Sequence, residues 1–352
     1  MDLNQILSWL AQTNDAALTQ LWAKADAARA ANVGDEVQLR GLVEISNHCT
    51  SNCAYCGIRA ANTTVTRYRM EADEILACAR DARRLGYGTL VLQSGEDAKL
   101  STDFITDVVS RVKAETTLAV TLSLGVRPKE DLEAWKAAGA DRYLLRFETS
   151  DPALFAKIHP PRCAPLAQRL AMLRVIHDLG FETGSGVMVG IPGQTYESLA
   201  RDILLFRELD LHMVGVGPWL PHPQTPLGHD EGPAPKDQVP NDELTTYKVV
   251  ALTRLLIPDA NIPSTTALTA RSGEEGRELG LQRGANVIMP NLTPPAYRRL
   301  YEIYPAKAKT ADNADAFDAR IKARIRAIGR VPGEGRGDSR AHRRHWQGGQ
   351  HD

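Results

Sequence analysis

Short apolar segments alternate with amphipathic stretches over most of the 352-residue chain. The apolar segments are rich in Val, Ile, Leu and Thr, and their length and composition are typical of buried strands. Eight segments have this character: Gly41–Ile45, Thr89–Gln93, Ala119–Leu124, Arg142–Glu148, Gly184–Val189, Met213–Gly217, Ile262–Thr266 and Asn286–Met289. The pattern predicts that each forms one strand of a sheet.

Amphipathic segments lie between the predicted strands and indicate helices. They are Glu71–Leu85, Thr102–Ala114, Lys129–Ala138, Leu166–Leu179, Tyr196–Leu209, Asp242–Leu256 and Glu274–Arg283. Several are followed by glycine, for example Gly86 and Gly180, which is a common end of a helix. Eight strands alternating with helices predict an α/β fold of the (β/α)8 TIM-barrel type, with a doubly wound open sheet as the alternative.

Three regions lie outside the repeat. Residues 1–36 predict an N-terminal helical extension that covers the bottom of the barrel, and the barrel itself is expected to span 37–308. A C-terminal helix is predicted within 309–330. Residues 331–352 are dense in Gly, Arg and His and poor in apolar residues, so we expect a disordered tail.

Composition excludes several classes of protein. The net charge is −1, which gives no basis for bulk binding to nucleic acid. No apolar run approaches the roughly 20 residues needed to span a bilayer. The first residues lack a basic region followed by an apolar core, so no signal peptide is expected and a cytoplasmic location is predicted.

Three of the five cysteines, Cys49, Cys53 and Cys56, lie within eight residues directly after the first predicted strand. Thiolates are the usual ligands of iron–sulfur clusters, and three without a nearby fourth leave one iron open. A zinc site with His48 is the alternative, although adjacent His48 and Cys49 would have difficulty in reaching one ion. Disulfides fit a long chain with few cysteines poorly. Cys78 and Cys163 are not expected to be ligands.

The CxxxCxxC spacing, with an aromatic residue, Tyr55, before its last cysteine, resembles the signature of the radical S-adenosylmethionine (SAM) superfamily. The resemblance implies a [4Fe–4S] cluster bound by Cys49, Cys53 and Cys56, whose open iron chelates SAM. It also implies that one electron splits SAM into methionine and a 5′-deoxyadenosyl radical.

A longer series of motifs resembles the HydE family of FeFe-hydrogenase maturases. The motifs include Arg67–Met70, Val91–Asp97, Asp141–Thr149, Met188–Thr195, Ala285–Asn291 and Tyr301–Pro305. The resemblance implies action on a small iron–carbonyl–cyanide–cysteine complex from HydG, a further partner HydF and a one-electron reductant. Biotin synthase and methylornithine synthase share part of the pattern and remain enzyme alternatives, and an iron–sulfur carrier is the non-enzymatic one.

One departure from the HydE pattern concerns a second cluster. Many HydE proteins bind it through cysteines beyond the Tyr-x-x-Tyr-Pro segment. Residues 305–320 of this chain contain no cysteine, so one cluster is expected.

The resemblance places SAM against residues that follow strands 1 to 5. They are Tyr55, Ser94, Gly95, Glu96, Arg146, Glu148, Arg169, Met188 and Ile191. The glycine of Ser94–Glu96 allows close backbone approach, and a guanidinium suits a carboxylate, which would explain Arg169. Arg146 and Glu148, two apart on one predicted strand, share a face. The competing interpretations are a simple turn at 94–96, a structural ion pair for Arg146 and Glu148, and a surface arginine for Arg169.

Neutral polar and soft side chains are predicted to contact the substrate deeper in the barrel. They are Gln93, Thr121, Ser123, Thr265, Thr266, Met289 and Tyr304. Hydroxyl and amide groups can hold a polar anion by hydrogen bonds without adding charge. Taken one at a time, each of these residues could equally be an ordinary barrel-core residue. His222 is interpreted as an ordinary loop histidine.

Overall fold

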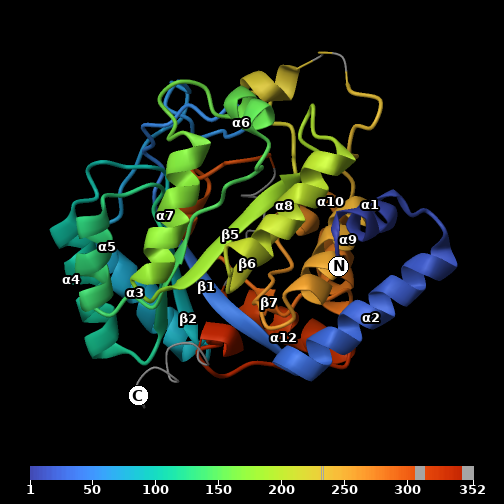
Figure 1. The fold of residues 1–352 in the computed structure, drawn as a ribbon. Helices are drawn as coiled ribbons and strands as arrows, with labels where there is room; N and C mark the ends of the chain where they lie inside the picture. The colour runs from blue at the N-terminus through green and yellow to red at the C-terminus, as the bar shows by residue number, and fades with distance from the viewer. Residues whose placement is uncertain (231, 233, 306–313, 343–352) are drawn as a thin grey trace.

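The structure, a computed structural model, describes residues 1–230, 232, 234–305 and 314–342, and it shows a curled parallel sheet surrounded by helices (Figure 1). The hydrogen-bonded order of the strands is β6-β5-β4-β3-β2-β1-β7, and β8 pairs with β1. The strands are β1 (Glu36–Ser46), β2 (Thr89–Ser94), β3 (Ala119–Ser123), β4 (Arg142–Leu144), β5 (Glu182–Val189), β6 (Met213–Pro218), β7 (Val287–Ile288) and β8 (Val331–Pro332). The prediction of a parallel barrel-type fold is confirmed.

The predicted strand Ile262–Thr266 closes the ring between β6 and β7, although it forms no regular strand. Parallel bridges join Met213 to Asn261 on one side and Pro263 to Val287 on the other. Pro263 has no N–H, so it cannot donate a ladder hydrogen bond, and this explains why the pairing is limited to isolated bridges. The position of segment 262–266 in the ring was therefore predicted correctly, but its regular strand pairing was not.

The helices surround the sheet as the amphipathic pattern predicts (Figure 1). They are α1 (Leu3–Ala11), α2 (Asp15–Val33), α3 (Ala72–Arg84), α4 (Thr102–Glu115), α5 (Lys129–Ala137), α6 (Pro152–Ile158), α7 (Leu166–Asp178), α8 (Tyr196–Glu208), α9 (Glu243–Leu256), α10 (Thr266–Gln282), α11 (Pro295–Arg298), α12 (Ala314–Ala327) and a short 3₁₀ helix, Pro226–His229. In α4 the Ser101 side chain accepts a hydrogen bond from the Phe104 amide and caps the helix. Apolar residues at helical spacing, from Ile105 to Val112, bury one face.

The N-terminal helices lie in a different place from the predicted one. α1 packs against α8 and α9, and α2 packs along α9, so both lie on the outside of the barrel (Figure 1). Leu18, Leu21 and Ala25 form the buried face of α2. The prediction that this extension covers the bottom of the barrel is wrong, because the bottom is occupied by the C-terminal segment.

The C-terminal segment 331–342 is ordered, so the prediction of a disordered tail is wrong for these residues; residues 343–352 lie outside the described part of the chain. Val331 pairs with Glu36 and Pro332 with Val37, which adds β8 beside β1. Beyond β8 the carbonyl groups of Arg336 and Gly337 accept hydrogen bonds from side chains inside the barrel. The prediction failed because it treated a polar composition as a sign of disorder, whereas this segment is held in place by polar contacts.

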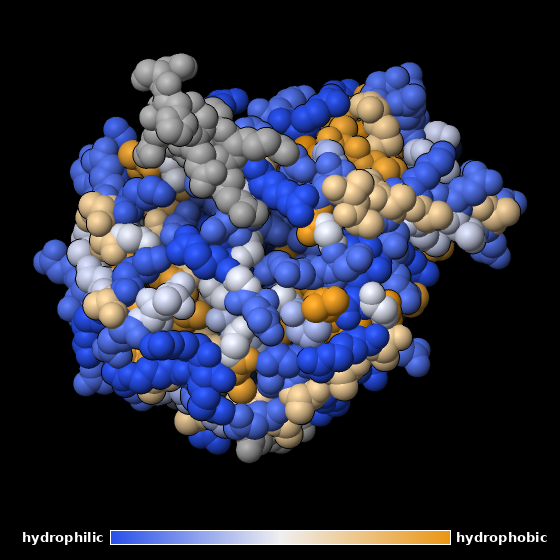
Figure 2. All heavy atoms as spheres, turned by 90° about the horizontal axis from the view of Figure 1, so that it is seen from below, coloured by the Kyte–Doolittle hydropathy of each residue, from blue (hydrophilic) through white to orange (hydrophobic). Residues whose placement is uncertain are grey.

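Buried charges at the bottom of the barrel explain why the segment binds there. The Arg142 side chain is fully buried on β4 and pairs with Glu182 of β5. Its remaining donors reach Asp338 at 2.5 Å, the Arg336 carbonyl oxygen at 2.9 Å and the Thr89 hydroxyl at 2.9 Å. A buried guanidinium without such partners would be strongly destabilising. Figure 2 shows that this end of the molecule is mainly hydrophilic, with apolar residues in small separate groups.

Removing the Asp338 carboxylate should therefore destabilise the whole barrel. Asp338→Ala is expected to lower the free energy of unfolding by about 2 kcal/mol, because Arg142 loses one of its two anionic partners. The matched control is Glu334→Ala, which removes an exposed carboxylate from the same segment and should change stability by less than about 0.5 kcal/mol. Urea unfolding followed by circular dichroism measures both, and equal midpoints for the two variants would contradict this role of Asp338.

Candidate active site

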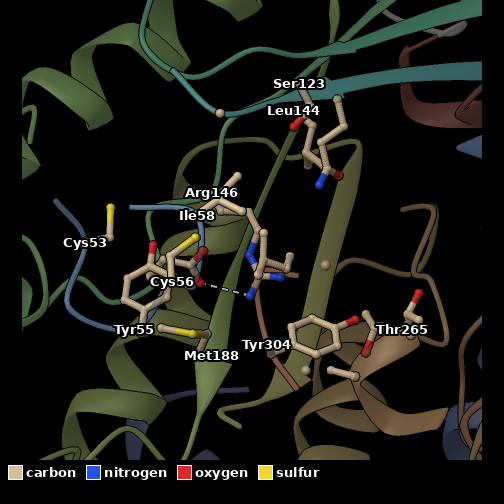
Figure 3. A pocket seen from close by; sticks show the side chains of 18 of the residues that line it. Cys53, Tyr55, Cys56, Ile58, Ser123, Leu144, Arg146, Met188, Thr265 and Tyr304 are labelled. Carbon is tan, nitrogen blue, oxygen red and sulfur yellow. Dashed lines mark ion pairs between the residues drawn. The ribbon is translucent and has the colours of Figure 1, made fainter. Parts of the chain in front are cut away.

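The carboxyl ends of the strands surround one cavity of about 330 Å³. Most residues predicted to bind cluster, SAM or substrate line it: Cys49, Cys53, Tyr55, Cys56, Gln93, Ser94, Gly95, Glu96, Ser123, Arg146, Glu148, Arg169, Met188, Thr265, Thr266, Met289 and Tyr304. Figure 3 shows Tyr55 and Cys56 on one side, Thr265 and Tyr304 on the other, and Arg146 between them. This is the end of the strands at which α/β barrels build their sites.

The three cysteines belong to a loop that follows β1 and contains neither helix nor strand between residues 47 and 62. One guanidinium, that of Arg67, organises this loop. It donates to four backbone carbonyl oxygens, those of Asn47 (2.5 Å), Ile58 (2.7 Å), Arg59 (2.8 Å) and Asn62 (3.0 Å). Backbone groups that would otherwise need water or a ladder partner are satisfied by this one side chain.

The chemistry of the thiols fits a multi-iron cluster better than a single ion. Among the described residues, no group of three or more His, Cys, Asp or Glu side chains that includes Cys49, Cys53, Cys56 or His48 has ligand atoms close enough together to share one ion. His48 also does not line the cavity that the three cysteines share. The wide spacing disfavours the zinc alternative, and it is compatible with a cubane, in which each thiolate binds a different iron. Burial raises the pKa of the Cys49 thiol, and a bound cation would favour the thiolate form.

Glycine at position 95 is required by the packing of the cluster loop. A Cβ atom at Gly95 would lie 2.3 Å from the carbonyl oxygen of His48. The next residue, Glu96, accepts a hydrogen bond from the Ser51 hydroxyl and pairs with Arg169 at 3.1 Å. The segment Ser94–Glu96 is therefore more than a simple turn, because it joins the cluster loop to α7.

Arg169 is buried and points into the cavity, so its interpretation as a surface arginine is wrong. One Nη donates to Glu96 and the other to the carbonyl oxygen of Arg146 at 3.1 Å. Its Nε is buried and has no hydrogen-bond partner among the described residues. The sequence pattern could not show this orientation, because Arg169 lies in the first turn of an amphipathic helix.

Arg146 and Glu148 meet as predicted, but by a different geometry. Regular β4 ends at Leu144, and Glu148 has a φ of 64°, so the two residues do not project from one face of a strand. They form an ion pair of 2.9 Å, which supports the structural-pair interpretation in this structure. The Glu148 amide donates to the Gly186 carbonyl oxygen, which anchors the turn to β5. Burial raises the pKa of the Glu148 carboxyl, while Arg146 opposes that rise.

The far end of the cavity contains the neutral residues predicted for substrate. Gln93 donates to the Tyr301 hydroxyl at 3.2 Å, and Thr265 donates to the Val216 carbonyl oxygen at 3.0 Å. Burial raises the pKa of the Tyr304 phenol, so it remains a hydrogen-bond donor at neutral pH. Tyr301 and Trp219 also line the cavity and were missed, although Tyr301 stands in the Tyr-x-x-Tyr-Pro motif.

Two predicted site residues do not line the cavity. Thr121 lies on β3 two residues before Ser123, so it points inward one layer deeper in the barrel. Ile191 is fully buried in a separate apolar cluster with Ala54, Leu154, Ile158 and Leu227. Its neighbour Gly190 has a φ of 80°, and a Cβ there would lie 2.2 Å from Asn241. The turn at 190–193 thus has a packing explanation of its own.

The remaining candidates have structural explanations. His222 is buried outside the cavity, and its Nδ1 accepts from the Gln224 amide. Cys78 lies on the buried face of α3. His177, Asp210 and His212 cluster near the N-terminal end of β6 with metal-like spacing. However, His212 Nδ1 accepts from the Thr183 amide, so the neutral ring carries its proton on Nε2, which cannot then bind a metal.

The Arg67 network generates a prediction about cluster assembly. Arg67→Ala should reduce the iron and sulfide bound per chain by more than half after anaerobic reconstitution, because the cysteine loop loses four hydrogen bonds. Wild type should bind about four of each. Arg67→Lys should not restore binding, since one ammonium has three donors and no planar fork. Arg111→Ala, on the exposed face of α4, is the matched control and should bind iron as wild type does. Full iron loading of a folded Arg67→Ala protein would overturn this role.

No helix in the described ranges has the length and apolar composition to cross a bilayer.

Comparison with known proteins agrees with the geometry. The model of the Radical SAM superfamily matches residues 43–206. The [FeFe] hydrogenase maturase subunit HydE of Thermotoga maritima is 46% identical over 331 residues, covering 94% of this chain and 91% of that protein. The 3-methylornithine synthase of Methanosarcina acetivorans is 27% identical, covering 82% and 77%. A crystal structure of methylornithine synthase has the same fold, with a TM-score of 0.81 and 24% identity over 94% of each chain. The chain therefore is a radical SAM enzyme and belongs to the HydE family.

Proposed function

We propose that this protein acts in the assembly of the FeFe-hydrogenase cofactor. In this proposal it uses one [4Fe–4S] cluster and SAM to modify the small iron–carbonyl–cyanide–cysteine complex made by HydG, and the product passes toward HydF. The observation that carries the proposal is the shared cavity. Cys49, Cys53 and Cys56 line one side of it and neutral polar side chains line the other, with two ion pairs between them.

The residues between the two ends fit SAM. Arg146 Nε, Arg169 Nε and Trp219 Nε1 are buried donors that lack hydrogen-bond partners among the described residues. Such donors suit a carboxylate and the acceptor atoms of adenine. Glu148 can accept from the SAM amino group, and Met188 and Tyr55 provide apolar surface beside it. With both bound, the cluster held by Cys49, Cys53 and Cys56 would supply the electron for reductive cleavage of SAM.

The neutral end of the cavity suits a compact anionic guest. Ser123, Thr265, Thr266 and Tyr304 offer hydroxyl groups, and none of them carries a charge that could repel an anion or exchange ligands with its iron. The ion pair of Arg146 and Glu148 separates this end from the cysteines. A substrate held there would lie next to the SAM region without touching the cluster ligands.

The SAM assignment predicts a loss of affinity on substitution. Arg146→Ala should weaken SAM binding by about 100-fold, because loss of a buried charged contact costs on the order of 3 kcal/mol. Iron content should remain that of wild type, since the hydrogen bonds and the ion pair of Arg146 in the described part of the chain go to Val187 and Glu148 and not to the cysteine loop. Arg201→Ala, an exposed arginine on α8 with its own ion pair, should bind SAM normally. Equilibrium dialysis with reconstituted protein measures the affinity, and an unchanged value for folded Arg146→Ala would place SAM elsewhere.

The identity of the substrate is tested by comparing three compounds. Reconstituted protein with SAM and a strong reductant is incubated separately with the HydG product, with lysine and with dethiobiotin. We expect 5′-deoxyadenosine to form in step with loss of the iron complex only. With HydG and HydF the protein should also activate apo-hydrogenase, and Cys56→Ser should not. Consumption of lysine or dethiobiotin would indicate a mutase or a sulfur-insertion enzyme, and absence of SAM cleavage would indicate a carrier.

A further inference from the structure

Cys163 lies against the cluster loop, although it is no part of the CxxxCxxC motif. Its Sγ is 3.8 Å from the Sγ of Cys53, which is van der Waals contact between two sulfur atoms. Both thiols are free and partly exposed. The chain thus places a fourth cysteine beside the central cysteine of the motif, on a segment more than 100 residues away in sequence.

The two segments that carry these thiols are joined by hydrogen bonds next to the contact. The Ala54 amide donates to the Ile158 carbonyl oxygen at 2.8 Å, and the Tyr55 hydroxyl hydrogen-bonds His159 at 3.2 Å. Cys163 ends the turn that begins at Pro160, and its amide donates to the carbonyl oxygen of Pro160. These bonds hold the two sulfurs near each other at the contact distance of 3.8 Å.

We propose that Cys53 and Cys163 form a disulfide when the motif holds no cluster and a disulfide oxidant is present. The S–S bond requires the sulfurs to approach to about 2.05 Å, which is a side-chain adjustment from their present contact. With oxidised glutathione, one protein thiolate attacks the reagent and releases one glutathione thiolate. The second protein thiol loses its proton to water and attacks the mixed disulfide, which releases the second glutathione thiolate. Two protein thiols are oxidised, and one oxidised glutathione is reduced to two thiols.

The disulfide makes cluster assembly depend on reduction. Cys53 is one of only three ligands in the motif, so its oxidation removes the cluster site, whereas Cys163 is not needed for a three-thiolate cluster. This inference rests on the cluster-binding role of Cys53 in the proposed function. In the cluster-free protein, Cys163 is the redox partner of Cys53. In the cluster-bound enzyme Cys53 is a ligand, so the disulfide does not form.

The test uses cluster-free full-length protein, reduced, desalted without oxygen and then treated with oxidised glutathione. Free thiols are alkylated, and tryptic peptides are mapped by mass spectrometry under non-reducing conditions. We expect the main product to join the peptide of residues 41–59 to that of residues 163–169, with Cys53 as the linked residue in fragment spectra. A main disulfide within residues 41–59, a link to Cys78, or only a mixed glutathione disulfide would overturn the proposal.

Iron loading provides the second readout. Oxidised wild type should take up several-fold less iron than reduced wild type, and dithiothreitol should restore uptake. Cys163→Ser should load fully when reduced and keep most of its loading after oxidation, while Cys78→Ser should behave as wild type. Poor loading of reduced, folded Cys163→Ser would make Cys163 a ligand and overturn the proposal. The peptide map does not depend on the hydrogenase assay. A missing disulfide can therefore be distinguished from a missing maturation activity.

Discussion

The chemistry of this protein depends on one constraint: a loop without regular structure must hold three thiols at fixed positions. The Arg67 guanidinium meets that constraint by binding four carbonyl oxygens at once. Its planar fork of donors can do this where a point charge could not. Gly95 then allows β2 to approach the loop, and Glu96 connects the loop to Arg169 on α7. The cysteine loop and the region proposed for SAM are therefore a single hydrogen-bonded unit.

Arg142 and Arg146, at opposite ends of the barrel, differ in how completely their donors are used. At the bottom Arg142 is fully buried and its donors reach Glu182, Asp338, a hydroxyl and a backbone carbonyl. At the cavity Arg146 has Glu148 and the Val187 carbonyl oxygen, but its Nε has no partner among the described residues. A satisfied guanidinium stabilises a fold, whereas an incompletely satisfied one retains donors for a ligand. Arg146 therefore differs from Arg142 in retaining an Nε donor, which the proposed SAM could use.

The sequence predicted the features that follow from local pattern. Parallel strands buried on both faces leave a clear apolar run in the sequence. Strands β1 to β7 and the irregular segment 262–266 were therefore placed within a few residues. Features that depend on long-range polar contacts were missed. Residues 331–342 look like a disordered tail because their composition is polar, and only the buried charges of β4 and β5 explain their order. The positive φ of Glu148 and the depth of Thr121 likewise depend on how the barrel closes.

The five cysteines show how position decides the chemistry of one residue type. Cys78 lies in the core of α3, where burial raises the pKa of its thiol to about 12 and keeps it unreactive. Cys49, Cys53 and Cys56 stand on the loop that Arg67 organises, and all three line the cavity. Cys163 reaches the same place from the turn after α6, in contact with Cys53. A motif search finds three of these residues, but the fourth becomes visible only when the barrel brings the ends of β1 and α6 together, because sulfur contacts depend on tertiary geometry and carry no sequence spacing of their own.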